Sequence, residues 1–231
     1  MATVVLLRHA RSTANNSGVL AGRSGGVHLD ESGRRQAAAV VERLAEVPLR
    51  GIVVSPLLRC GQTVEPLAAA RGLTPVVEGD LAEVDYGSWT GRAIKDLLGE
   101  PLWKVVQQHP SAAVFPGGEG LAGVQARAVA AVRAHDARVT AEFGDRAVWL
   151  LCSHGDVIKA LLADALGQHL DSFQRIVVDP ASVSVVRYTE TRPFVLRMND
   201  SGRELGGVVP PEPAVGDAPA GEAVVGGSTG R

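Results

Sequence analysis

The sequence has few cysteines, no long apolar run and almost no net charge, and each shortage excludes a class of protein. Cys60 and Cys152 are the only cysteines in 231 residues, too few for a disulfide scaffold and outside any C-x-x-C metal-ligand spacing. We interpret both as small buried residues. No segment approaches the ~20 apolar residues that span a bilayer. The net charge of -2 predicts no general attraction to nucleic acid or to an anionic membrane.

The N-terminus lacks the features of a secretory leader, because Arg8 interrupts the first apolar run. We therefore expect a cytoplasmic protein. With 45% hydrophobic residues, the chain is long enough for one domain with a substantial core. We assign this domain to residues 1–199. Residues 200–231 are rich in Gly, Pro, Ala, Glu and Val and show no periodicity, which predicts a disordered tail.

Alternating strand and helix patterns predict the fold class. Apolar runs at 4–7, 51–54 and 147–152 are typical of central strands buried on both faces. Helical periodicity fills the intervals, starting after Asp30 as a helix N-cap and again over 119–143. We expect a three-layer α/β/α sandwich with a mixed, mostly parallel central sheet.

Shorter patterns complete this prediction. Pro75 confines a strand at 74–77 to a sheet edge. Strand patterns at 182–188 and 194–198 predict an antiparallel pair, which makes the sheet mixed. Residues 15–29 are rich in Gly, Ser and Asn and predict a loop, which forms a rim or lid beside the first strand.

Three of the expected strands end in residues suited to binding phosphate. Arg8 and His9 follow the first strand in V-V-L-L-R-H-A-R-S-T-A-N, Arg59 follows the second in V-V-S-P-L-L-R-C-G-Q-T, and His154 follows V-W-L-L-C-S-H-G-D. Ligands of open α/β sheets bind beyond the carboxyl ends of the strands. A guanidinium group matches phosphate oxygens with its planar fork of donors. Convergence of these side chains therefore predicts a site for a phosphoryl group.

In combination these motifs resemble the histidine phosphatase superfamily, in the branch of phosphoglycerate mutases and related phosphatases. The similarity runs from about Val4 to Arg187. L-R-H-A-R-S-T-A-N resembles the family's R-H-G opening, with Ala10 in place of the glycine. S-P-L-L-R-C-G-Q-T resembles its second arginine motif, L-A-E-V-D-Y-G-S-W-T-G its acidic motif, and S-H-G-D its second histidine.

The resemblance implies catalysis without a metal ion or another cofactor. His9 is the expected nucleophile, because neutral imidazole, with its ordinary pKa of ~6.5, is available at pH 7 and can carry a phosphoryl group. Arg8, Arg59 and a protonated His154 would stabilise the charge of the transferring group. The cationic pocket then does what a metal ion does in other phosphatases.

Glu83 is the expected acid for the leaving alkoxide. Nearby aromatic residues such as Tyr86 and Trp89, together with a bound dianion, would raise its pKa toward neutrality. Asp85 is the rival, because in an extended segment it lies on the same side as Glu83, and only the family position ranks it second. The candidate substrate contacts are Ser12, Asn15, Gly22, Tyr86, Arg92 and Gly155.

We therefore expect a phosphomonoesterase of the histidine acid phosphatase type, acting on a small-molecule phosphate ester. A cofactor-dependent phosphoglycerate mutase and a non-catalytic phospho-ligand-binding protein are the alternatives. The interval from Glu83 to His154, 154 - 83 = 71 residues, is short beside the resembling mutases, whose insertion brings a tandem arginine pair. The adjacent arginines of this chain, Arg34 and Arg35, belong to an early helix. The natural substrate and the oligomeric state, with a homodimer as one candidate, stay open.

Overall fold

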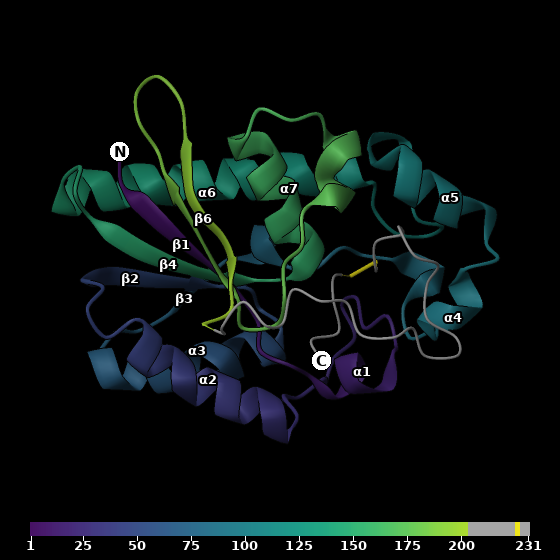
Figure 1. The fold of residues 1–231 in the computed structure, drawn as a ribbon, viewed down its shortest axis with the longest axis horizontal. Helices are drawn as coiled ribbons and strands as arrows, with labels where there is room; N and C mark the ends of the chain where they lie inside the picture. Colours follow the sequence, from purple (N-terminus) through teal and green to yellow (C-terminus); the bar gives the residue numbers. More distant parts are fainter. Residues whose placement is uncertain (203–224, 227–231) are drawn as a thin grey trace.

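The computed structural model of the chain describes residues 1–202 and 225–226 (Figure 1). Six strands form one sheet in the order β3-β2-β4-β1-β5-β6. Neighbouring strands among β1 to β4 pair in parallel, whereas β5 pairs antiparallel with both β1 and β6. The predicted mixed sheet is thus confirmed. The strands are β1 (Thr3–Arg8), β2 (Leu49–Val54), β3 (Val76–Val77), β4 (Val148–Ser153), β5 (Val183–Arg187) and β6 (Phe194–Asp200).

Helices cover both faces of this sheet. On one face lie α2 (Glu31–Arg43) and α3 (Leu58–Arg71), and on the other lie α6 (Leu121–Phe143) and α7 (Gly155–Ala165) (Figure 1). The three-layer α/β/α arrangement expected from the strand and helix alternation is therefore present. The remaining described helices and 3₁₀ turns lie in the connections: α1 (Thr13–Ser17), α4 (Ile94–Leu97), α5 (Pro101–Gln108), and turns at Gly79–Leu81, Gly87–Trp89, Pro110–Ala112 and Leu170–Arg175.

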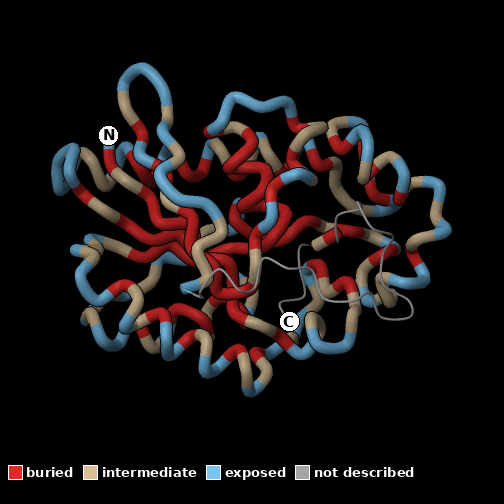
Figure 2. Tube along the Cα trace, viewed as in Figure 1, coloured by how far each residue is buried: buried red, intermediate tan, exposed pale blue. Residues whose placement is uncertain are grey.

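The first strand shows why the central strands have uninterrupted apolar sequences. Val4 and Leu6 join the hydrophobic cluster under α6 and α7, and Val5 and Leu7 join the cluster under α2 and α3. Successive strand residues point to opposite faces, and here both faces are covered. Figure 2 shows the resulting buried centre of the sheet. The residues that follow such a central strand lie at the carboxyl edge of the sheet.

Local caps set the boundaries of two helices, and the one at Asp30 was predicted. The Asp30 carboxylate accepts a hydrogen bond from the Gly33 amide at 2.7 Å and starts α2. Gly72, at φ +61°, ends α3 in the left-handed conformation that glycine adopts without strain. Pro66 lies inside α3, and the helix continues through it.

The prediction of a loop from residue 15 is wrong at its beginning. Residues Thr13–Ser17 form α1, and Ser12 caps this helix through a reciprocal pair of hydrogen bonds with Asn15. The helix buries none of its residues, so it leaves no hydrophobic periodicity in the sequence. Its capping pair is the only local signal.

Part of the predicted C-terminal tail lies outside the described residues, because of 200–231 only 200–202 and 225–226 are described. The latter two lie apart from the rest of the described chain in sequence (Figure 1, yellow segment). Within the described residues, no helix is both long enough and apolar enough to cross a bilayer. Cys60 and Cys152 are free and buried, as predicted.

Candidate active site

The parallel pairing of β1 and β4 brings the two predicted histidines together. Arg8 is in register with Ser153, so His9 and His154 both follow directly from the carboxyl edge of the sheet. The His9 amide donates a hydrogen bond to the Ser153 carbonyl at 2.9 Å. The two imidazole rings lie with their centroids 5.2 Å apart. The convergence that the sequence predicted is present in the structure.

Arg59, on the first turn of α3, contacts both histidines. Its Nε donates to Nε2 of His9 at 3.2 Å, and its Nη2 donates to the Gly22 carbonyl at 2.9 Å and lies 3.2 Å from Nδ1 of His154. Within the described part of the chain, its Nη1 is buried and has no acceptor. A buried donor without a partner is costly, so this nitrogen indicates the position of an anionic ligand.

The hydrogen bonds of His9 define which ring nitrogen can react. Nδ1 lies 2.8 Å from the carbonyl oxygen of Ala10, which can only accept, so Nδ1 carries the proton. Nε2 then holds the lone pair that accepts from Arg59. Burial, followed by the positive charges of Arg59 and Arg8, lowers the pKa of His9 well below its ordinary value. His9 is therefore neutral near pH 7 and keeps a nucleophilic Nε2.

His154 is held by a residue that the sequence analysis did not include. Its Nε2 lies 2.7 Å from Oγ of Ser55, a residue that follows β2. Burial, then Arg59 and the neighbouring His9, lower the pKa of His154 well below the ordinary value. Desolvation and a cation within hydrogen-bond distance both disfavour a positive charge on this ring. The expectation of a protonated His154 concerned the site with a transferring phosphoryl group, and it stays a prediction. The S-P dipeptide after the strand was the available signal for Ser55.

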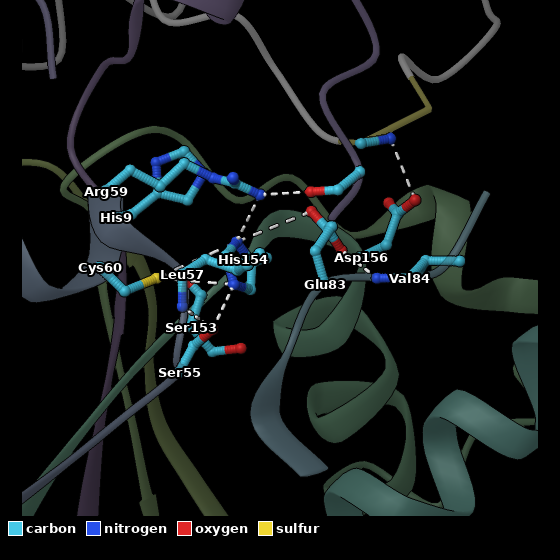
Figure 3. Close-up of polar contacts among 12 residues, drawn as sticks. His9, Ser55, Leu57, Arg59, Cys60, Glu83, Val84, Ser153, His154 and Asp156 are labelled. Atoms are coloured by element: carbon cyan, nitrogen blue, oxygen red, sulfur yellow. Dashed lines mark hydrogen bonds and ion pairs between the residues drawn. The ribbon is translucent and has the colours of Figure 1, made fainter. Parts of the chain in front are cut away.

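Glu83 and Arg59 both approach Nδ1 of His154 (Figure 3). Oε1 of Glu83 accepts from the Val84 amide at 2.9 Å, and its Oε2 is 4.0 Å from Nδ1 of His154. Burial and the negative charge of Asp156 raise its pKa to about 7, against the opposing effect of Arg59. The sequence analysis expected the pKa of Glu83 to be raised by aromatic neighbours and a bound dianion. In the structure the largest cause is burial, followed by the charge of the Asp156 carboxylate. The carboxyl group can hold or release a proton near neutral pH.

The structure separates Glu83 from its rival Asp85. Glu83 is 3% exposed and lines the same pocket as His9. Asp85 uses its Oδ1 to accept from the Gly87 amide at 3.0 Å and is not part of the pocket lining. Its carboxylate therefore stabilises the turn at Gly87–Trp89. In the sequence, only the family position ranked Glu83 above Asp85 as the candidate acid. The structure adds that Glu83, and not Asp85, lines the pocket.

Four of the six candidate substrate contacts line the pocket: Ser12, Asn15, Gly22 and Tyr86. Arg92 does not, because its guanidinium pairs with Glu100 at 2.6 Å. Gly155 is the first residue of α7 and also lies outside the lining. Ser12 and Asn15 bond to each other: Oγ of Ser12 donates to Oδ1 of Asn15 at 2.8 Å. Either side chain can reach a ligand only by exchanging that bond.

Arg8 is fully buried and does not line the pocket. Nη1 donates to the Val178 carbonyl at 2.7 Å and Nη2 to the Gly226 carbonyl at 3.2 Å. Near it, the buried Asp156 accepts from the Tyr86 hydroxyl at 2.8 Å and from Lys159 at 3.3 Å. Asp156 is the second residue that sequence reasoning missed, although it belongs to the S-H-G-D motif. Among the described residues, no three His, Cys, Asp or Glu side chains are placed to hold a metal ion.

The comparison with protein families agrees with this geometry. The model of the histidine phosphatase superfamily (branch 1) matches residues 4–201. The chain belongs to this superfamily. The match covers all five residues expected to act in catalysis.

Individual relatives carry different activities in their names. The chain is 30% identical to phosphoserine phosphatase 1 of Hydrogenobacter thermophilus over 86% of its own length and 92% of that protein. It is 32% identical to "Probable phosphoglycerate mutase GpmB" of Yersinia pestis, over 83% of its own length and 87% of that protein. Its fold is similar to that of a mycobacterial glucosyl-3-phosphoglycerate phosphatase solved with VO3, at a TM-score of 0.77 and 27% identity, covering 86% of this chain and 98% of that one.

Proposed function

We propose that this member of the histidine phosphatase superfamily is a phosphomonoesterase that hydrolyses small phosphate esters through phosphohistidine on His9. The observation that carries the proposal is the state of His9. Its Nδ1 is tied to the Ala10 carbonyl, and its Nε2 lone pair is held by Arg59 in a pocket that also contains Glu83. The pocket thus contains the three groups that phosphoryl transfer needs: a nucleophile, a cation and an acid.

In the first step, Nε2 of His9 attacks phosphorus, and the N–P bond forms as the ester P–O bond breaks. The leaving alkoxide takes the proton from Glu83. The Arg59 guanidinium gives up its bond to Nε2 of His9 and donates instead to phosphoryl oxygens. Its Nη1, which has no acceptor among the described residues, donates to them as well. Preorganised donors of this kind stabilise the charge that develops on the transferring group.

In the second step, the Glu83 carboxylate removes a proton from water. The water oxygen attacks phosphorus, the P–N bond breaks, and inorganic phosphate leaves with neutral His9 restored. Nδ1 of His154 lies 3.2 Å from Nη2 of Arg59 and 4.0 Å from Oε2 of Glu83. A bound phosphoryl dianion favours its protonation, so His154 is proposed to gain its charge only when substrate is present.

This assignment predicts a pH dependence for the acid step. Glu83 is protonated below its pKa of about 7, so its acid form is present under mildly acidic conditions and is lost as the pH rises. We expect kcat/KM for an alkyl phosphate to fall about tenfold per pH unit above ~7, since one proton is required. The lowered pKa of His9 keeps the nucleophile neutral on the acidic side.

The measurement is the ratio of kcat/KM values for an alkyl phosphate and for nitrophenyl phosphate between about pH 5.5 and 9. The aryl ester is the matched control, because nitrophenolate leaves without a proton, and the second ionisation of the phosphate affects both esters. A ratio that stays constant across this range would remove Glu83 from the acid step.

The mutase alternative is supported by the name of the Yersinia relative, and the pocket favours hydrolysis. Among the residues described, Arg59 is the one arginine that lines the pocket, and Arg34 and Arg35 lie on α2, so no arginine pair is placed there for a substrate carboxylate. We expect nitrophenol release from nitrophenyl phosphate, and release of phosphate from 3-phosphoglycerate that is faster than its conversion to 2-phosphoglycerate.

Both reactions are followed in one tube primed with bisphosphoglycerate. Isomerisation many-fold faster than phosphate release would identify the chain as a mutase. No release of nitrophenol at any concentration would identify it as a phospho-ligand-binding protein.

A further inference from the structure

The segment Val225–Gly226 lies in the pocket of His9, far in sequence from every other lining residue. Both residues line the same pocket as His9, Arg59 and Glu83. The Gly226 carbonyl accepts from Nη2 of Arg8 at 3.2 Å, and its amide donates to Oδ2 of Asp156 at 3.0 Å. Gly226 therefore bonds to a buried cation, Arg8, and to a buried anion, Asp156.

The surroundings of this segment fit an apolar side chain at residue 225 and the lack of one at residue 226. Val225 is 1% exposed and belongs to the hydrophobic cluster that includes Leu20 and Tyr86. Gly226 has φ +82°, and a Cβ atom on it would lie 3.1 Å from Cδ1 of Leu20. A larger residue at 226 would be both strained and crowded. The contact is therefore specific to a small residue after an apolar one.

Val225 and Gly226 line the cavity beside His9 together with Arg59 and Glu83, whereas Arg8 does not line it. Nη2 of Arg8 donates to the Gly226 carbonyl. A phosphoryl oxygen in this cavity can therefore take over that hydrogen bond only if the Gly226 carbonyl leaves it.

We propose that Val225–Gly226 is an intramolecular competitor of the phosphate ester, in which the Gly226 carbonyl occupies the Arg8 donor that a phosphoryl oxygen takes. The inference rests on the proposed function, since it treats Arg8 as a phosphate contact. A neutral carbonyl is a weaker acceptor for a guanidinium than a phosphate oxygen is, so a dianion displaces the segment. Asp156 then loses the Gly226 amide and keeps Tyr86 and Lys159.

Two substitutions in the full chain test the competition. Val225→Asn places an amide in a hydrophobic cluster, and the side chain of Gly226→Val clashes with Leu20. Each variant should therefore release the segment while Arg8 itself is unchanged. The apparent affinity of a site improves by the reciprocal of the fraction that is already open, and we expect KM for a phosphate ester to fall about 3- to 10-fold. Val76→Asn, on the exposed strand β3, and Gly99→Val, where a Cβ atom meets nothing within 4 Å, are the matched controls and should keep the wild-type KM.

Binding of inorganic phosphate gives a second test that needs no turnover. Calorimetry should show a Kd for phosphate lowered in both variants by the same factor as KM. Hydrogen exchange of the wild-type peptide that covers 225–226 should become faster when phosphate is added, because competition is reciprocal.

Unchanged or raised KM and Kd values in Val225→Asn and Gly226→Val would overturn the inference, and so would slower exchange with phosphate, which would make the segment a part of the binding site. Failure of the proposed function looks different. In that case no ester is hydrolysed by any variant, while phosphate still binds more tightly once the segment is released.

Discussion

Replacing His9 with Ala should remove essentially all turnover, with a loss of at least ~10³-fold in kcat/KM. The reason is that the P–N bond has no second candidate atom: among the described residues, the other imidazole near the pocket, that of His154, directs its Nδ1 to Arg59 and Glu83 and its Nε2 to Ser55. Rapid quench with labelled substrate should show an acid-labile, base-stable adduct in the wild type and none in His9→Ala.

Two further histidine variants control this experiment. His154→Ala should leave some phosphoryl transfer to His9, because His154 is proposed to act on charge and not as the nucleophile. His169→Ala changes an exposed histidine and should behave as the wild type does. A wild-type amount of adduct in His9→Ala would show that the nucleophile has been misassigned.

Replacing Glu83 with Gln should slow an alkyl phosphate by ~10²-fold or more, in the usual range for general acid catalysis. The same change should hardly slow the transfer step of nitrophenyl phosphate, whose leaving group needs no proton. Gln keeps the size of the side chain and an acceptor for the Val84 amide, so the loss reports the missing proton and not a collapsed pocket. Pre-steady-state bursts with the two substrates measure the transfer step directly.

Asp85→Asn is the matched control for this prediction. Asp85 caps a turn through the Gly87 amide, and an Asn side chain can accept the same bond, so both substrates should react at rates near the wild type. Equal losses for the two substrates in Glu83→Gln would move the acid role to another group or to water.

The buried strands account for how much of the site the sequence predicted. β1 and β4 are covered on both faces, so their apolar runs have clear ends, and the polar residues that follow must lie at the sheet edge. His9 and His154 were therefore placed by position alone. The helix start at Asp30 was equally plain, because an N-cap is a local hydrogen bond between residues three apart.

Features without a local signal were missed. The helix α1 buries no residue, so no periodicity marks it. Arg92 was a candidate substrate contact in the sequence. Its pairing with Glu100 depends on how the segment between them folds. The lowered pKa of His154 depends on burial and on Arg59, which is 95 residues away in the chain.

By itself, the sequence determined the fold class, the family and the five residues proposed to act in catalysis, because strand burial and motif order are encoded in neighbouring residues. Only the tertiary structure decided the charges of the site, since the pKa values of His154 and Glu83 depend on burial and on charged groups from other segments. Only the tertiary structure showed that Gly226 forms hydrogen bonds with Arg8 and Asp156. The contact with Arg8 joins residues 218 positions apart, and the contact with Asp156 joins residues 70 positions apart. A carbonyl and an amide, which every residue except proline offers equally, leave no mark in a sequence.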